Sequence, residues 1–185
     1  MLIARSTQEA HLYMDLHACV CGAEDFEREH RLDERDGVLV AVYEGVCPRC
    51  GRARSFAFRL TDELPPAPPA FGGAEPSRII DPGEFLWVAD QIATDTGLRL
   101  LHTPPAERRD QREGSAFALA AVEEVLKFLP EGADRVPEEL ITSERGREVF
   151  HRNPHRFERA ALLENIARKR RILEGVDHFS PPPGA

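Results

Sequence analysis

Four cysteines gathered in one short stretch constrain this chain more than any other feature. They are Cys19, Cys21, Cys47 and Cys50, and the 185 residues contain no others. Two close pairs separated by about 25 residues are typical of a metal site, whereas disulfide frameworks belong to secreted proteins. The first residues lack the apolar segment of a secretory signal, so we expect a cytoplasmic protein with reduced thiols. The pattern therefore predicts that the four thiolates bind one metal ion.

The second cysteine pair lies in the segment Cys47-Pro48-Arg49-Cys50-Gly51 and has the sequence of a metal-binding turn. Such a turn points both thiolates to one side, because the backbone amides after the first cysteine turn toward its sulfur. The glycine after the second cysteine permits the positive φ angle that the turn requires. The first pair, in Cys19-Val20-Cys21-Gly22, also ends in glycine, but one residue separates its cysteines instead of two.

Residues 17–60 resemble a zinc ribbon, in which a metal-binding turn, a β-hairpin, a second turn and a strand follow one another. The resemblance implies that the four cysteines are the ligands of one Zn²⁺ ion. A site with four thiolates has no position for water or substrate, so this zinc would be structural. The short first spacer leaves His17 as an alternative ligand, and the same ligand set leaves iron as an alternative metal. Thiol–disulfide exchange at Cys47 and Cys50 is disfavoured, because the pair lacks the strand-then-helix context of redox proteins.

The residues around the cysteines predict a small β unit. Apolar residues alternate with polar ones over residues 26–32, 38–46 and 55–60, which indicates three strands. Asp36-Gly37 is a favourable hairpin turn between the first two strands. A short helix is expected over residues 7–16, with Thr7 as its N-cap.

The rest of the chain predicts helices. Residues 64–70 hold four prolines and indicate a stiff connector. We therefore expect a zinc ribbon with its helix over residues 1–63, a proline-rich linker over 64–76 and a helical domain over 77–185. The fold class is α+β: a small N-terminal zinc-ribbon β unit and a mostly α-helical C-terminal part of four or so helices.

Local signals place the predicted helices. The first begins at Asp81-Pro82-Gly83-Glu84, which combines an N-cap, a proline at the first helical position and a capping box, and Gly97 is expected to end it. Residues 115–129 form the next helix, with a possible break at Gly114. A short helix over 143–150 has Thr142 as its cap. The last helix opens at Asn153-Pro154 and buries one apolar stripe, made of Phe157, Ala161, Leu162, Ile166 and Ile172.

The net charge and the hydropathy of the chain limit the classes of partner that it can bind. The chain has 24 basic and 32 acidic residues, a net charge of −8, which argues against broad binding to nucleic acid. No stretch approaches the roughly 20 apolar residues that a membrane helix needs, so we expect no membrane contact.

Motifs of known catalytic sites are missing, including the nucleophile elbow, the Walker loop, the zinc-protease motif and the dinucleotide-binding glycines. His151 and His155 are four residues apart, but Asn153-Pro154 between them breaks a continuous helix, so a second metal site there is disfavoured. We therefore expect a non-catalytic zinc-binding protein, an adaptor or inhibitor-like partner that acts through protein–protein interaction.

An acidic surface on the predicted hairpin would serve that role toward a basic protein partner. It would be made of Glu24, Asp25, Glu27, Glu29, Asp33, Glu34 and Asp36. Two alternatives stay open. One is a nucleic-acid-associated factor that uses the basic run 168–171 and an arginine edge, made of Arg49, Arg52, Arg54 and Arg59. The other is an enzyme with an unrecognised active site.

Overall fold

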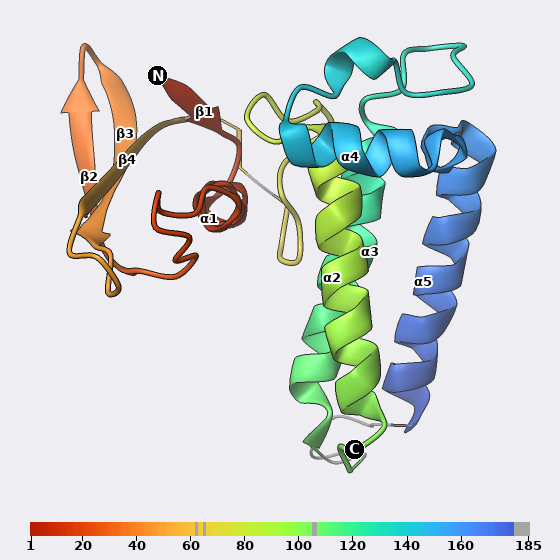
Figure 1. Cartoon of the computed structure of the whole chain (residues 1–185). Helices are drawn as coiled ribbons and strands as arrows, with labels where there is room; N and C mark the ends of the chain where they lie inside the picture. Colours follow the sequence, from red (N-terminus) through yellow and green to blue (C-terminus); the bar gives the residue numbers. More distant parts are fainter. Residues whose placement is uncertain (62, 65, 105–106, 180–185) are drawn as a thin grey trace. The chain divides into compact units, whose positions relative to one another are not determined.

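The computed structural model describes residues 1–61, 63–64, 66–104 and 107–179. The chain divides into two compact units (Figure 1), Met1–Gly73 with Ser77–Ile79, and Ala74–Pro76 with Ile80–Ala185. The described strands all belong to the first unit, together with one helix, and the other helices belong to the second. This confirms the predicted α+β class. None of the helices in the described ranges is long and apolar enough to cross a membrane.

The first unit is built on a mixed sheet with the strand order β1-β4-β3-β2. Its strands are β1 (Leu2–Ala4), β2 (Glu27–Arg35), β3 (Val38–Val46) and β4 (Ala53–Leu60). β2, β3 and β4 run antiparallel to one another, whereas β1 pairs with β4 in parallel. The three predicted strands are confirmed, with shifted ends. β1 was not predicted, because a strand of three residues is too short to show alternation.

The predicted hairpin turn is confirmed. Asp36 and Gly37 have φ angles of 54° and 74°, and they connect the paired residues Arg35 and Val38. Two central residues with positive φ form the type I′ turn, whose twist matches that of the flanking strands. This turn fixes the register of β2 on β3, and so brings the two cysteine-bearing turns to the same end of the sheet.

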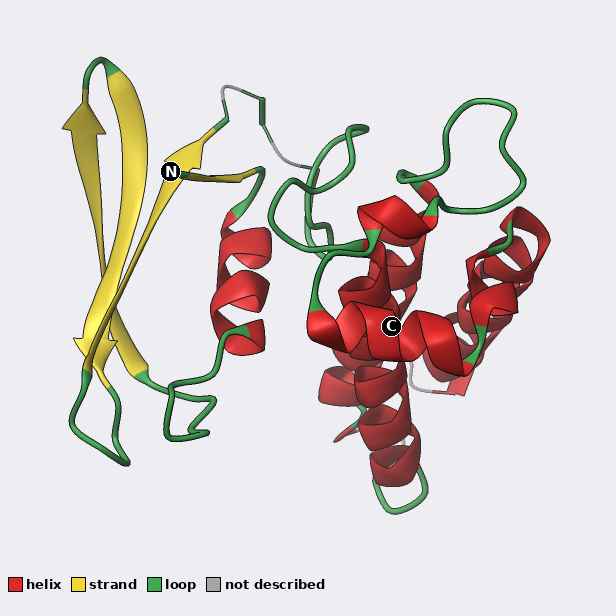
Figure 2. Cartoon of the chain, turned by 45° about the horizontal axis from the view of Figure 1, so that its top comes forward, coloured by secondary structure: helices red, strands yellow, loops and turns green. Residues whose placement is uncertain are grey.

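Helix α1 (Thr7–Leu16) packs against one face of the sheet (Figure 2). Its buried Ala10 and Met14 join Ala41, Tyr43 and Phe58 in one apolar cluster. This cluster is the core of the first unit. Because it is small, the free energy of apolar burial available to the unit is limited.

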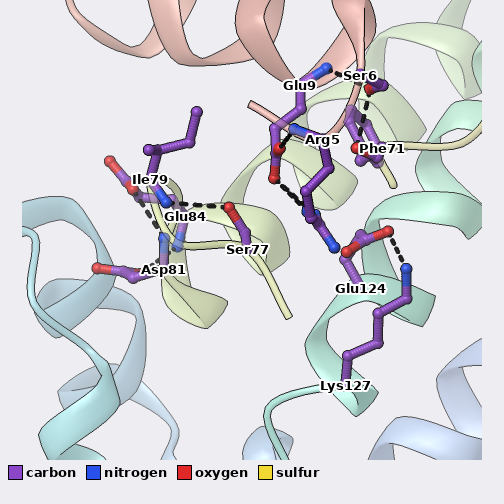
Figure 3. Close-up of polar contacts among 10 residues, drawn as sticks. All are labelled: Arg5, Ser6, Glu9, Phe71, Ser77, Ile79, Asp81, Glu84, Glu124 and Lys127. Carbon is purple, nitrogen blue, oxygen red and sulfur yellow. Dashed lines mark hydrogen bonds and ion pairs between the residues drawn. The ribbon is translucent and has the colours of Figure 1, made fainter. Parts of the chain in front are cut away.

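The N-cap of α1 is Ser6 and not the predicted Thr7. The Ser6 Oγ accepts from the Glu9 amide at 3.0 Å, and Thr7 is already helical. The same hydroxyl donates to the Phe71 carbonyl at 2.9 Å (Figure 3), and Phe71 is buried. The Gln8 side chain accepts from the Ala70 amide at 2.9 Å. The end of the proline-rich segment is thus attached to α1.

The second unit contains four α-helices and two short 3₁₀ helices within the described ranges. They are α2 (Pro82–Leu100), α3 (Arg109–Leu126), η2 (Glu138–Leu140), α4 (Glu144–Arg152), η3 (Pro154–Phe157) and α5 (Arg159–Phe179). α3 contacts both α2 and α5, and α4 contacts α2. Figure 1 shows α2, α3 and α5 side by side, with α4 across one of their ends.

One buried carboxylate starts two of these helices. Asp81 is 6% exposed, and its Oδ1 accepts from the amides of Gly83 and Glu84 at 2.8 and 2.9 Å. Its Oδ2 accepts from the amides of Thr142 and Ser143 at 3.0 and 2.6 Å. The Glu84 carboxylate accepts in return from the Asp81 amide at 3.2 Å (Figure 3). The predicted capping box of α2 is confirmed, and the same aspartate also holds the start of α4.

Five details of the helical prediction were wrong. The last helix, α5, begins at Arg159, because the predicted start at Asn153-Pro154 opens the separate 3₁₀ helix η3. α2 continues past Gly97 to Leu100, because an isolated glycine weakens a helix without ending it. Gly114 lies inside α3 and does not break it. The cap of α4 is Ser143, whose Oγ accepts from the Gly146 amide at 2.9 Å, and not Thr142. Ile172 was expected to face inward but is 48% exposed.

Candidate metal centre

The four cysteine sulfurs of the first unit converge on one point. The Sγ atoms of Cys19, Cys21, Cys47 and Cys50 all lie within 4.8 Å of one another. The distance from Cys19 to Cys50 and that from Cys21 to Cys47 are both 3.6 Å. These values exceed the ~2.05 Å of a disulfide bond. They match the edge of a tetrahedron around Zn²⁺, which is roughly 3.8 Å for metal–sulfur bonds of about 2.3 Å. The thiols are unbridged and their arrangement suits a metal ion.

The first cysteine turn closes with hydrogen bonds despite its short spacer. The Gly22 amide donates to the Cys19 carbonyl at 2.7 Å, and the Cys19 amide donates to the Ala23 carbonyl at 2.8 Å. Gly22 has a φ angle of 81°, which a residue with a side chain adopts only with strain. The glycine thus lets a spacer of one residue present both Cys19 and Cys21 to the cluster.

The second cysteine turn joins the end of β3 to the start of β4. The Gly51 amide donates to the Cys47 carbonyl and the Cys47 amide donates to the Arg52 carbonyl, both at 2.9 Å. Gly51 has a φ angle of 70°, as expected from the sequence. Because β3 and β4 are paired up to Val46 and Ala53, the sheet itself sets the position of this turn.

The thiols differ in how readily they ionise. Burial opposes ionisation of Cys47, but the amides of Cys50 and Arg49, with the thiols of Cys21 and Cys50, donate to its sulfur and lower its pKa to about 6. The Arg52 amide favours the thiolate of Cys50, but the sulfurs of Cys21, Cys19 and Cys47 together raise its pKa to about 11. The thiolate thus forms more readily at Cys47 than at Cys50. A cation is needed before all four sulfurs can carry negative charge together.

Two arginines that the sequence assigned to a surface edge instead support the centre. Arg54 is only 8% exposed, and its guanidinium donates to the carbonyls of His17 and Glu24 and lies over the ring of Phe26. Arg49 donates to the Cys21 carbonyl at 3.0 Å and so joins the two turns. Sequence reasoning missed this role, because Arg54 contacts His17, Glu24 and Phe26, which are distant from it in sequence.

His17, the alternative ligand, is outside the cluster that the four cysteines form. Its ring stacks on Tyr13, with centroids 3.9 Å apart, and its Nδ1 donates to the Tyr13 carbonyl at 2.7 Å. The cluster therefore consists of the four cysteines alone.

The histidine pair and the basic run noted in the sequence do not form a second site. His151 lies on α4 and His155 on η3, where its Nδ1 contacts a Glu158 carboxylate oxygen at 2.9 Å. Within the described ranges, no second group of three or more His, Cys, Asp or Glu converges on one point. In the basic run 168–171, Arg170 pairs with Glu123 at 2.6 Å and Lys169 is buried. The run is therefore not one continuous basic surface.

The acidic residues of the hairpin remain at the surface. Glu24, Asp25, Glu27 and Glu29 are exposed in and before β2, which is an edge strand of the sheet. We call these four residues the acidic edge. Val46 is paired opposite Glu27 and is 56% exposed. Asp33, by comparison, is engaged by Arg31 and Arg35 at 3.3 and 3.2 Å.

Comparison with known proteins brings no further identification. No protein-family model, no curated protein and no solved structure matches this chain.

Proposed function

We propose that Cys19, Cys21, Cys47 and Cys50 bind one structural Zn²⁺ ion that stabilises the first unit. The observation that carries this proposal is the convergence of the four sulfurs within 4.8 Å. Four thiolates saturate a tetrahedral ion, so the metal offers no open position for catalysis. The small apolar core of the unit gives such an ion a stabilising role, because metal binding adds to the free energy of folding.

Elemental analysis of the purified chain tests this proposal. We expect one zinc per chain, and a stoichiometric release of zinc when the thiols are modified. Rubredoxin-like iron would reveal itself by visible absorption from sulfur-to-iron charge transfer. A chain that folds cooperatively in its first unit after complete removal of metal would contradict a structural role.

We further propose that the first unit is a protein-interaction module whose acidic edge contacts a basic partner. Glu27 and Glu29 have no ion-pair partner among the described residues, and they extend from an edge strand. Exposed Val46 next to Glu27 adds an apolar contact to this charged surface. Carboxylates arranged this way steer and orient a positively charged protein surface.

The contacts of the basic residues favour a protein partner over nucleic acid. Arg54 is buried inside the first unit, Lys169 is buried inside the second, and Arg170 is neutralised by Glu123. These three residues therefore do not supply the accessible positive charge that phosphate contacts require. The acidic edge would moreover repel phosphate from the first unit.

Affinity purification with the zinc-loaded chain tests the interaction. We expect a basic protein in stoichiometric amount at moderate salt, and a clear loss when Glu27→Gln and Glu29→Gln are combined. The matched control combines Glu138→Gln and Glu139→Gln, two exposed glutamates of η2 in the second unit, and should leave recovery unchanged. Equal recovery with both double variants, or recovery that depends on nucleic acid, would contradict the proposal.

A further inference from the structure

Lys169 in the second unit is a buried basic residue in a run of exposed ones. It is 6% exposed, whereas Arg168, Arg170 and Arg171 on the same turn of α5 are exposed. Its Nζ donates to the Ala89 carbonyl of α2 at 3.3 Å. A buried ammonium group is costly unless a negative charge compensates it. The negative charge that compensates the Lys169 ammonium group therefore has to be identified.

No carboxylate in the described part of the chain forms an ion pair with Lys169. Asp90 is the acidic side chain that interacts electrostatically with Lys169. Both Asp90 carboxylate oxygens, however, are paired with the Arg156 guanidinium at 2.8 Å. Burial lowers the pKa of Lys169; Asp90 opposes this shift, and Arg168 and Arg156 add to it. The residues around the Lys169 amine thus do not balance its positive charge.

A cavity of about 90 Å³ lies between α2, α3 and α5, and Lys169 is one of the residues that line it. Apolar side chains form most of its wall, among them Ala93, Leu100, Ala118 and Ile172. Lys169 is joined in the wall by two hydroxyl-bearing residues, Thr96 and Ser115, which are both buried. Ile172 is 48% exposed, so the cavity reaches the surface beside it.

The cavity has a size that suits a small organic molecule. A water molecule occupies about 30 Å³ in the liquid, so the space corresponds to roughly three water molecules, or to a carboxylate of about four or five heavy atoms. Phosphate would need many donors to replace its hydration, and the wall offers one ammonium group and two hydroxyls. A neutral molecule would leave the ammonium group without a counter-charge.

We propose that this cavity binds a small monocarboxylate with a short apolar body. The carboxylate pairs with the ammonium group of Lys169 and lies near the hydroxyls of Thr96 and Ser115. The apolar body lies against Ala93 and Ala118. Apolar walls with a few converging polar groups are the general form of small-molecule sites. In this proposal, Lys169 of the basic run 168–171 binds a carboxylate and not a phosphate.

Nuclear magnetic resonance of lysine-labelled, zinc-loaded protein tests this inference, because the chain has only two lysines, Lys127 and Lys169. Titration with propionate should move the Lys169 signal saturably, with a Kd on the order of 1 mM. The Lys127 signal, from the residue that pairs with Glu124 at 2.5 Å, should remain in place. Propionamide, which has the same apolar body without the charge, should bind at least about tenfold more weakly.

Three variants separate binding from folding. Lys169→Met removes the charge, and Ala118→Leu fills the cavity while keeping the amine. Both variants should abolish propionate binding measured by calorimetry. Arg170→Met, which removes the neighbouring surface charge, should bind like the original chain. Trp87 lies in α2, and its fluorescence checks that each variant keeps its fold. The inference is overturned if propionate and propionamide bind equally, if propionate binding does not saturate, or if Ala118→Leu binds propionate normally.

Discussion

Backbone amides converge on one acidic side chain in each unit, but the two groups differ in what completes them. In the first unit, the amides of Arg49 and Cys50 turn toward the sulfur of Cys47, which lies among three other sulfurs. In the second unit, the carboxylate of Asp81 accepts from four amides and needs no further ligand. The comparison teaches that the amide cluster around Asp81 is complete within itself, whereas the cysteine cluster gathers negative charge that a cation must balance.

The chain carries separate optical probes for the two units. Both tyrosines, Tyr13 and Tyr43, belong to the first unit, and the single tryptophan, Trp87, belongs to the second. Near-ultraviolet circular dichroism of tyrosine therefore reports on the first unit, and tryptophan fluorescence reports on the second. Separate probes are needed because a protein of two units does not have to unfold in one transition.

The largest effect should follow from Cys47→Ser, which removes one of the four proposed zinc ligands. A structural zinc contributes an apparent binding free energy on the order of 10 kcal/mol, so we expect loss of zinc and unfolding of the first unit. The tyrosine signal should collapse while the tryptophan signal persists. Val20→Ser changes a residue that is 78% exposed between two ligands, and should keep both zinc and fold. If the tyrosine signal of Cys47→Ser shows the same unfolding transition as the original chain, the first unit does not depend on the metal and the comparison between the units is wrong.

Acidification should have the second-largest effect, and it should destabilise the first unit more than the second. The pKa of about 6 for the folded Cys47 thiol lies below the ~8.5 of an unfolded cysteine. Its contribution to stability is therefore fully present above about pH 8.5 and is lost as the pH falls through 6. Bound zinc extends this range downward, because protons must displace the metal. We expect a chromophoric chelator to detect zinc release below pH 6, together with the tyrosine transition. Retention of zinc at about pH 4 would contradict thiolate ligation.

Asp81→Ala should have the largest effect among single changes in the second unit. It removes the caps of α2 and α4 together, and we expect a loss of about 3 kcal/mol in the free energy of unfolding. Ser143→Ala removes only the side-chain cap of α4, and should cost about 1 kcal/mol. Urea unfolding followed by Trp87 fluorescence measures both. If the two variants lose equal stability, the carboxylate does not join the two helices as its contacts indicate.

Local patterns made part of this molecule predictable. The spacing of the cysteines, the glycines after them, the Asp36-Gly37 turn and the capping box at Asp81 are all short-range features. They depend on residues within a few positions of one another, where backbone geometry and hydrogen bonding decide the structure. The cluster of the four cysteines follows from such features, because the hairpin register brings the two turns together.

Features that depend on distant residues were not predictable. The burial of Arg54 requires Phe26, from a distant part of the chain, to lie beneath it together with Phe56 of the same strand, and the local sequence contains only Phe56. Lys169 is buried because the cavity beside it is lined by small residues of α2 and α3, such as Ala93 and Ala118. In a run of four basic residues, sequence alone does not indicate which one turns inward. β1 likewise exists only through its pairing with β4.

Two glycines of α2, Gly83 and Gly97, should give effects of opposite sign, and the Gly97 effect should be the smallest of all. A Cβ at Gly83 would lie 2.4 Å from the Cα of Gly146, so Gly83→Ala forces the starts of α2 and α4 apart. We expect a loss of about 1–3 kcal/mol, as in overpacked cores. A Cβ at Gly97 meets nothing within 4 Å, and alanine there should stabilise by about 0.5–1 kcal/mol through helix propensity. Urea unfolding followed by Trp87 fluorescence measures both changes, and the tyrosine signal should not move in either variant. A destabilising Gly97→Ala would mean that α2 is strained at its far end, so that the second unit is less complete than its caps indicate.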